Sequence, residues 1–174
     1  GEKKKFTEVK TFPVPLPLKE IKEKITITTN TPFNTSKEQI INQAFKFHSQ
    51  GNFLEAAKYY QFFIDQGFND YRVFSNYGVI LKNLGKLQDA ELLTRKAIKL
   101  NPNYSKAYYN LGVILLDLNK LQDAELSTRK AIELNPNDAK AHSNLGGILK
   151  DLGKSQDAEL STRKAIELNP NDAK

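Results

Sequence analysis

The fold is decided by residues 105–138, which read SKAYYNLGVILLDLNKLQDAELSTRKAIELNPND. Shifted forward by 34 residues, this stretch falls on residues 139–172, and shifted back by the same amount it falls on 71–104. Residues 122–140 match residues 156–174 letter for letter. A fixed period of about 20–50 residues predicts a repeat array, in which each unit buries its apolar face only against its neighbours.

Each unit contains two amphipathic segments. In the central copy, apolar residues recur at helical spacing over residues 108–118 and again over 121–134. Between them lies Asn119, at a place where the sister copies carry glycine, which suits the left-handed end of a helix. Pro136 ends the second segment, because proline disfavours helical geometry in the preceding residue. Gly112 and Ala124 are small, so we expect two helices to cross closely there.

The unit also carries a spaced pattern of a large residue, a Leu-Gly pair, two alanines and a closing proline. In the central copy these are Tyr108, Leu111, Gly112, Ala124, Ala131 and Pro136. The pattern resembles the tetratricopeptide repeat (TPR). This resemblance implies an all-α, right-handed superhelical solenoid of antiparallel helix pairs. One departure recurs, since Thr94, Thr128 and Thr162 stand where the family usually has an aromatic residue, and we expect looser packing there.

We predict a leader over residues 1–36 and a TPR array over 37–174. The array divides into repeats of about 37–70, 71–104, 105–138 and 139–172. The leader has seven lysines against four glutamates, and residues 12–18 alternate proline with apolar residues, which favours an extended path. The leader is either a flexible segment, or a docking peptide or a segment that lies along the first helices.

The first repeat, residues 37–70, is degenerate. Ser36 with Gln39 three residues on forms a capping-box pattern. Ile40, Ala44 and Phe47 give one helical face, and a second helix follows the break at residues 51–52. The many aromatic residues between 45 and 68 indicate either a heavily packed terminal repeat or an aromatic ligand surface.

After residue 172 no polar closing helix follows, so we expect Leu160, Ile166 and Leu168 to be partly bare. Two explanations are open: the chain is a fragment of a longer array, or it associates end to end with itself.

Composition excludes several classes of function. Cysteine is absent and there are only two histidines, so we predict no disulfide, no metal site and no cofactor. No catalytic motif is visible, and we predict that the chain is not an enzyme. No run approaches the roughly 18 apolar residues of a membrane span, and we predict a cytoplasmic protein without membrane contact. The net charge of +6 suggests nucleic acid, but the charge is spread along the chain and nucleic acid binding is disfavoured.

A column of asparagines recurs with the period of the repeat: Asn42, Asn76, Asn110 and Asn144. A carboxamide offers both a donor and an acceptor, so a column of them can pair with the main chain of an extended peptide. The column is similar to the asparagine ladder in the TPR arm of protein O-GlcNAc transferases, and this resemblance places it in the concave groove. The alternative is hydrogen bonding between helices of neighbouring repeats.

Basic residues near three helix starts, Arg72, Lys106 and Lys140, would favour acidic groups beside this column, with Tyr109 and Leu116 for apolar contact. We therefore predict a protein–protein interaction scaffold that binds an extended peptide or partner protein in the concave groove. The alternative function is the substrate-recognition arm of a larger enzyme, such as a protein glycosyltransferase.

Overall fold

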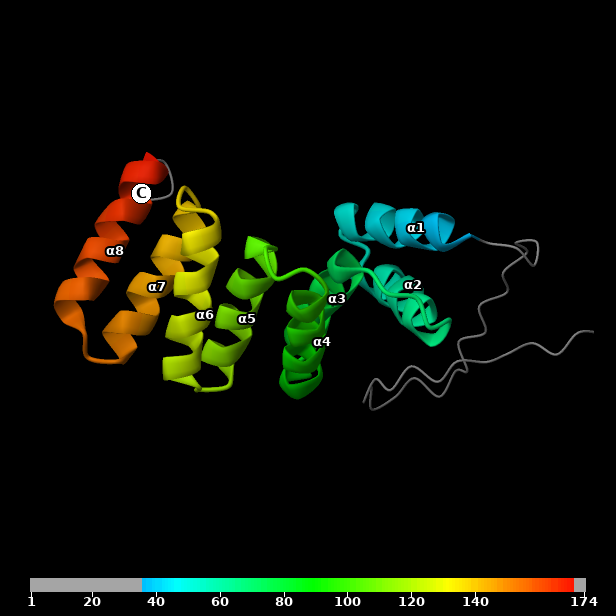
Figure 1. Cartoon of the computed structure of the whole chain (residues 1–174), viewed down its shortest axis with the longest axis horizontal. Coiled ribbons are helices and arrows are strands. Elements are labelled where there is room, and N and C mark those ends of the chain that lie inside the picture. Colours follow the sequence, from blue (N-terminus) through cyan, green and yellow to red (C-terminus); the bar gives the residue numbers. More distant parts are fainter. Residues whose placement is uncertain (1–35, 171–174) are drawn as a thin grey trace, which may run out of the picture. The chain divides into compact units, whose positions relative to one another are not determined.

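The computed structural model describes residues 36–170, all of whose regular elements are α-helices. They divide into two compact units, one ending at Phe68 and one starting at Asn69 (Figure 1). The first unit contains α1 (Lys37–Ser49) and α2 (Phe53–Asp65). The second contains α3 (Tyr71–Asn83), α4 (Leu87–Leu100), α5 (Ser105–Asp117), α6 (Leu121–Leu134), α7 (Ala139–Asp151) and α8 (Ser155–Leu168). The predicted all-α solenoid is confirmed, whereas the leader proper, up to residue 35, lies outside the described residues.

The first unit is a helical hairpin with the predicted cap. The Ser36 Oγ accepts a hydrogen bond from the Gln39 N–H at 3.3 Å, and the Gln39 Oε1 accepts one from the Ser36 N–H at 2.8 Å. These two reciprocal hydrogen bonds fix the residue at which α1 begins. Ile40 on α1 and Phe63 on α2 are buried, and the two helices pack against each other.

Aromatic residues pack mainly against one another inside this hairpin. Phe47 stacks on Tyr59 with ring centroids 5.5 Å apart, and the fully buried Tyr60 places its hydroxyl 3.1 Å from the His48 Nδ1. Phe53 is exposed. Much of the aromatic excess in the first repeat therefore contributes to its own core.

The second unit consists of three hairpins whose turns have the same backbone conformation. Gly85 and Gly153 have φ of 74°, and Asn119 takes φ of 57° at the equivalent place. Asparagine is one of the few residues other than glycine that tolerates this left-handed region. The predicted left-handed helix ends are confirmed.

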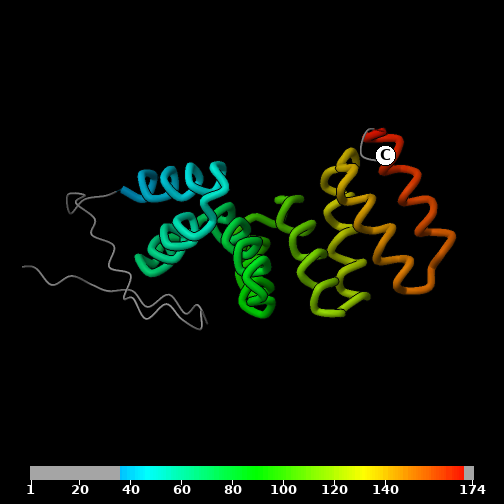
Figure 2. Tube along the Cα trace, turned by 180° about the vertical axis from the view of Figure 1, so that it is seen from behind, coloured from blue at the N-terminus to red at the C-terminus, as the bar shows by residue number. Residues whose placement is uncertain are grey.

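Successive hairpins share their apolar core. In this unit α4 packs on α5 and α6 packs on α7, and α5 also contacts both α3 and α7. The tube in Figure 2 shows α5 to α8 following one another in chain order. One buried cluster joins Leu111 and Leu115 of α5 to Ala124 of α6 and Ile148 of α7, and Ile98 of α4 packs against it. No single hairpin of this unit could bury these side chains alone.

Glycine allows the two helices of each hairpin to approach closely. A Cβ atom on Gly112 would overlap the hydroxyl oxygen of Thr128, and one on Gly78 would overlap that of Thr94. Both threonines are fully buried, and the Thr94 hydroxyl donates to the Ala90 carbonyl at 2.8 Å. The expectation of looser packing at Thr94 and Thr128 is therefore wrong, because the small threonine lets the backbones come closer than an aromatic residue would.

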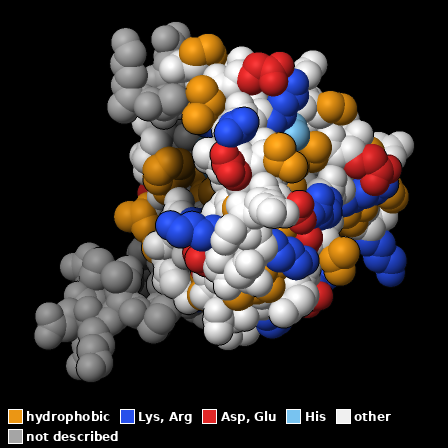
Figure 3. Space-filling view, turned by 90° about the vertical axis from the view of Figure 1, so that its left-hand side faces the viewer, with side chains coloured by type: hydrophobic (Ala, Val, Ile, Leu, Met, Phe, Trp, Pro, Cys, Tyr) orange, Lys and Arg blue, Asp and Glu red, His pale blue; other side chains and the backbone are white. Residues whose placement is uncertain are grey.

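Leu160 on α8 is exposed, but the missing closing helix, which the sequence led us to expect as the cause, is not the cause. Leu160 is 65% exposed, but Leu92 and Leu126 at the equivalent places of the other two hairpins are each 67% exposed. Ile166 behaves as expected, since it is 46% exposed while Ile98 and Ile132 pack against a following hairpin. In the view of this end in Figure 3, hydrophobic side chains lie scattered among charged ones. End-to-end self-association stays a prediction.

A glutamate on α4 and another on α6 each join their hairpin to the next one. The Glu125 carboxylate accepts from Arg129 on the same helix at 3.0 Å and from Lys154 of the following hairpin at 2.7 Å. Glu91 repeats this arrangement with Arg95 and Lys120. The bond to Lys154, and to a smaller extent that to Arg129, holds the pKa of Glu125 below its ordinary value, although burial opposes the shift.

Gly112→Ala should lower the free energy of unfolding by about 1–3 kcal/mol, because the added methyl overlaps a buried, β-branched side chain with few rotamers. Gly147→Ala is the matched control: it is an exposed helical glycine whose Cβ would meet nothing within 4 Å. This control should gain about 0.5–1 kcal/mol. Urea denaturation measures both, and Gly112→Ala combined with Thr128→Ala should be less unstable than Gly112→Ala alone. Equal effects of the two glycine substitutions would contradict the close crossing.

Glu125→Gln should cost about 0.5–1 kcal/mol at pH 7, because it weakens a connection between two hairpins. Since the folded-state pKa is depressed below the ordinary 4.5, the stabilisation is present above that pH and is lost as pH falls through the folded pKa. The deficit of Glu125→Gln should therefore vanish in acid. Glu159→Gln is the control, since Glu159 is 63% exposed and, among the described residues, pairs with Arg163 alone, and its effect should be smaller. Urea melts at pH 7 and pH 3 would show a constant deficit if this account were wrong.

Candidate functional site: the first-helix face

The predicted site residues of the second unit all lie on its first helices, α3, α5 and α7. We call the side chains of Arg72, Asn76, Lys106, Tyr109, Asn110, Leu116, Lys140 and Asn144 the first-helix face. Asn42 lies exposed on α1, in the other unit. The face thus spans three successive repeats.

Arg72 is committed to a partner on its own helix end. Its Nη2 lies 2.8 Å from the Asp70 Oδ2, and its backbone N–H donates to the Asp70 Oδ1 at 2.8 Å, so Asp70 both caps α3 and pairs with the guanidinium. Burial by itself would raise the pKa of Asp70, but the hydrogen bonds from Arg72 hold that pKa below its ordinary value. Asp70 therefore partly neutralises the positive charge of Arg72, which makes Arg72 less available to an acidic ligand than the sequence predicts.

Lys106 and Lys140 are different. Both side chains are exposed in the first turns of α5 and α7, one period apart. Neither ammonium group has an ionic or hydrogen-bonding partner among the residues that the structure describes. Two free cations in successive repeats can meet carboxylates of a ligand without first giving up an internal partner.

The asparagines of the column are not equivalent. Asn110 is only 7% exposed, and its Nδ2 donates to the Oγ of Ser75, one repeat earlier, at 3.0 Å. Asn144 is half-buried and donates to the Oγ1 of Thr128 at 3.3 Å. Asn76 is also half-buried and has an interaction of its own. The column thus forms contacts between repeats, as the alternative interpretation supposed, at Asn110 and Asn144.

These contacts of Asn110 and Asn144 use the nitrogen of the side-chain amide. The Oδ1 of Asn110 accepts no hydrogen bond within residues 36–170, and no buried side-chain oxygen there lacks a partner, so this oxygen reaches the surface. A surface carbonyl oxygen held in place by its own amide nitrogen is a pre-positioned acceptor for a main-chain N–H.

Tyr109 and Leu116 lie on α5 and are both half-buried. Burial, with a smaller effect of the nearby Asp138, raises the pKa of the Tyr109 hydroxyl, so that this group remains a neutral donor at physiological pH. Leu116 packs against the shared core cluster of Leu111, Leu115, Ala124 and Ile148. Its apolar surface is therefore used partly in stacking repeats.

Two further residues of this region were not predicted. Ser75 and Thr128 are fully buried hydroxyl residues that accept from the asparagines of the following repeat. In the sequence, such a residue is visible as a polar residue among the apolar residues of a helix, as Ser75 is between Phe74 and Tyr77. That signal marks burial but does not identify the partner, which comes from another repeat.

Within residues 36–170, no group of three or more His, Cys, Asp or Glu side chains could hold a metal ion. None of the helices in that range is long and apolar enough to cross a bilayer.

Asn110→Ala should destabilise the fold by about 1–2 kcal/mol, because it leaves the buried Ser75 hydroxyl without its donor. Ser75→Ala in the Asn110→Ala background should then cost little more, giving a coupling of about 1 kcal/mol in a double-mutant cycle. Thermal or urea unfolding of the four proteins measures the coupling. The same cycle with Asn144 and Ser75, which do not bond each other, is the control. Additive effects of Asn110 and Ser75 would argue against the bond.

The comparisons with solved structures concern the fold. The crystal structure of MamA is 21% identical over 80% of this chain and 81% of that chain, with a TM-score of 0.72. A MamA structure from Desulfovibrio magneticus RS-1 is 18% identical over 81% and 80% of the two chains, with a TM-score of 0.71. YrrB, described as a TPR protein with an unusual peptide-binding site, is 20% identical over 79% and 71%, with a TM-score of 0.69. At these identities the likeness shows the helical solenoid alone.

The sequence comparison is more direct. No curated protein matches the chain. Two family models described as tetratricopeptide repeat match residues 71–104 and residues 105–138 and 139–172, which together are more than half of the chain. These ranges coincide with the three sequence periods and with the hairpins α3–α4, α5–α6 and α7–α8. The chain belongs to the tetratricopeptide repeat family.

Proposed function

We propose that this protein is a non-catalytic scaffold whose first-helix face binds an extended, acidic peptide segment of a partner protein. The observation that carries the proposal is the pair of exposed ammonium groups of Lys106 and Lys140, which lack partners within the described residues. They recur with the repeat, so they suit a ligand that runs along successive repeats. Internal ion pairs occupy most other cations of these hairpins, including Arg72 and Arg95.

The asparagines supply the second element. The Asn110 Oδ1 is held at the surface by the bond of its amide nitrogen to Ser75, and it can accept from a peptide N–H. Recognition of this kind reads the main chain rather than the side chains, so it tolerates many sequences. The carboxylates contacting the lysines then select acidic segments.

The test uses a fluorescein-labelled peptide of alternating glutamate and serine, 12 residues long, titrated with the full chain and followed by fluorescence anisotropy. Lys106→Glu combined with Lys140→Glu should weaken binding at least about tenfold, because two attractions become repulsions. Lys46→Glu combined with Lys86→Glu changes the net charge equally at residues outside the first-helix face and should weaken binding much less. Circular dichroism checks that both variants keep their helicity.

Main-chain recognition has its own control. The same peptide with alternate nitrogens methylated keeps its carboxylates but loses half of its N–H donors, and we expect weaker binding. No binding of the unmodified peptide, or equal loss in the two charge variants, would overturn the proposal. Equal binding of the methylated peptide would retain the lysines but remove the asparagines from the site.

A further inference from the structure

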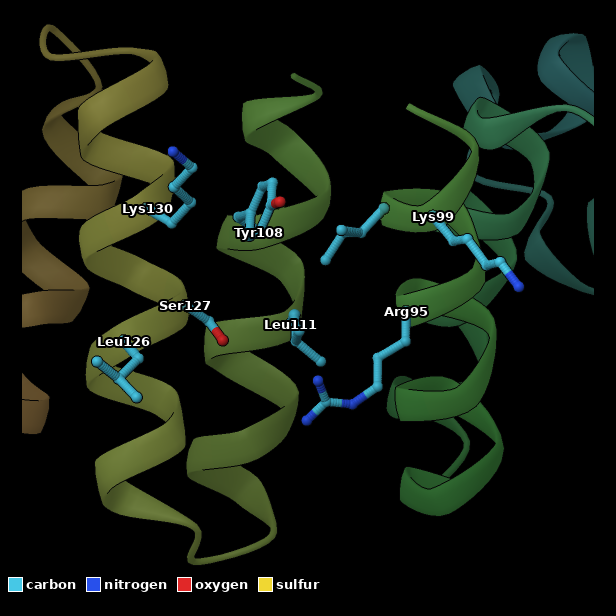
Figure 4. Close-up of a pocket in the computed structure, with 8 residues that line it drawn as sticks. Arg95, Lys99, Tyr108, Leu111, Leu126, Ser127 and Lys130 are labelled. Atoms are coloured by element: carbon cyan, nitrogen blue, oxygen red, sulfur yellow. The ribbon is translucent and has the colours of Figure 1, made fainter. Parts of the chain in front are cut away.

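A groove opens on the opposite side of the second unit, between the second helices α4 and α6, with α5 as its floor (Figure 4). We call it the second-helix groove. Its volume is about 350 Å³, at the small end of the roughly 300–1,000 Å³ of ligand pockets. Such a volume suits one or two bulky side chains of a partner better than a large cofactor.

The lining is apolar below and basic at the edge. Ile98, Tyr108 and Leu111 are the apolar and aromatic lining residues, and Arg95, Lys99 and Lys130 are the basic ones, with no carboxylate among them. In Figure 4 the Arg95 side chain points toward α5, whereas the end of the Lys99 side chain points away from α5, so Lys99 must turn to reach a ligand in the groove. Leu126, which is 67% exposed, adds an apolar side chain at the α6 edge. A lone exposed leucine needs no explanation, but one beside an apolar floor extends the surface that a ligand can cover.

The charge at the rim is unbalanced. Arg95 pairs with Glu91, which Lys120 also contacts, and Lys130 pairs with Glu133. Lys99 is exposed and has no partner within the described residues. The groove thus has three lining cations and no lining carboxylate, and two of the cations pair with carboxylates outside the lining, so the rim complements an acidic ligand. Exposed ion pairs are weak, and a ligand carboxylate can compete for Arg95 and Lys130.

The next repeat lacks this combination of basic and aromatic lining residues. Residues 87–104 and 121–138 differ at only three places, and one of them replaces Lys99 with Glu133. The residue equivalent to Tyr108 is His142, whose Nε2 lies 2.9 Å from the Pro136 carbonyl oxygen. The same geometry one repeat later therefore carries a carboxylate at the rim and a smaller ring on its floor.

We propose that the second-helix groove binds an acidic peptide segment of a partner protein that carries a bulky apolar anchor. The anchor enters against Tyr108 and Leu111 and contacts Leu126. Flanking carboxylates bind Lys99 and the rim cations. This site is separate from the first-helix face, and either site could exist without the other.

The probe is a fluorescein-labelled peptide, Glu-Glu-Leu-Phe-Glu-Glu, measured by anisotropy on the full chain carrying Lys106→Glu and Lys140→Glu, so that the first-helix face does not also bind the acidic probe. All variants below are made in this background. Lys99→Glu, which installs the side chain of the next repeat, should weaken binding about tenfold or more. Lys46→Glu, an exposed position on α1 in the other unit, should leave it within about twofold and is the charge-matched control. Retained affinity in Lys99→Glu, or equal loss in both variants, would overturn the proposal.

A gain of binding is the stronger test, because it cannot arise from unfolding. Glu133→Lys combined with His142→Tyr recreates the lining of the groove one repeat later, so the stoichiometry should rise from one peptide to two. An unchanged stoichiometry would contradict the assignment of Lys99 and Tyr108. A peptide with both apolar residues changed to serine should bind at least about tenfold more weakly. Equal binding of that peptide, or tighter binding of a single-stranded oligonucleotide, would show a nonspecific basic patch instead.

Discussion

The close crossing of the two helices in each hairpin is the constraint on which the second unit depends. It requires a residue without a side chain at Gly78, Gly112 and Gly146, and a small partner at Thr94, Thr128 and Thr162. Part of the core forms within a hairpin, as in the cluster of Leu145, Leu149 and Ala158. Part of it forms between repeats, as the cluster around Leu111 and Ile148 shows.

Charges follow from that packing. Glu91 and Glu125 lie where one hairpin meets the next, and each accepts from an arginine of its own helix and a lysine of the following hairpin. These pairs occupy Arg95, Lys120, Arg129 and Lys154. Lys106 and Lys140 on the first helices and Lys99 on a second helix lack partners within residues 36–170, and they lie at the two surfaces for which we propose ligands.

Structural and binding roles can coexist in one side chain. Asn110 uses its amide nitrogen to join two repeats and keeps its carbonyl oxygen at the surface. An alanine substitution there changes stability as well as any recognition, so it cannot test binding by itself. Charge reversals at exposed lysines avoid this difficulty, because these side chains support no contact of the described fold.

Much of the fold could be predicted from the sequence, because a 34-residue period, helical spacing and glycines at turns are local properties of the chain. They determined the helix pairs, the left-handed ends at Gly85, Asn119 and Gly153, and the close crossing at Gly112. Only the tertiary structure decided which side chains are held in hydrogen bonds or ion pairs. Asn110 bonds Ser75 and Arg72 pairs with Asp70, whereas Lys106 remains free, and α4, α5 and α6 together enclose a groove. The physical reason is that burial and pairing depend on neighbours from other repeats, whose distance and direction no single period contains.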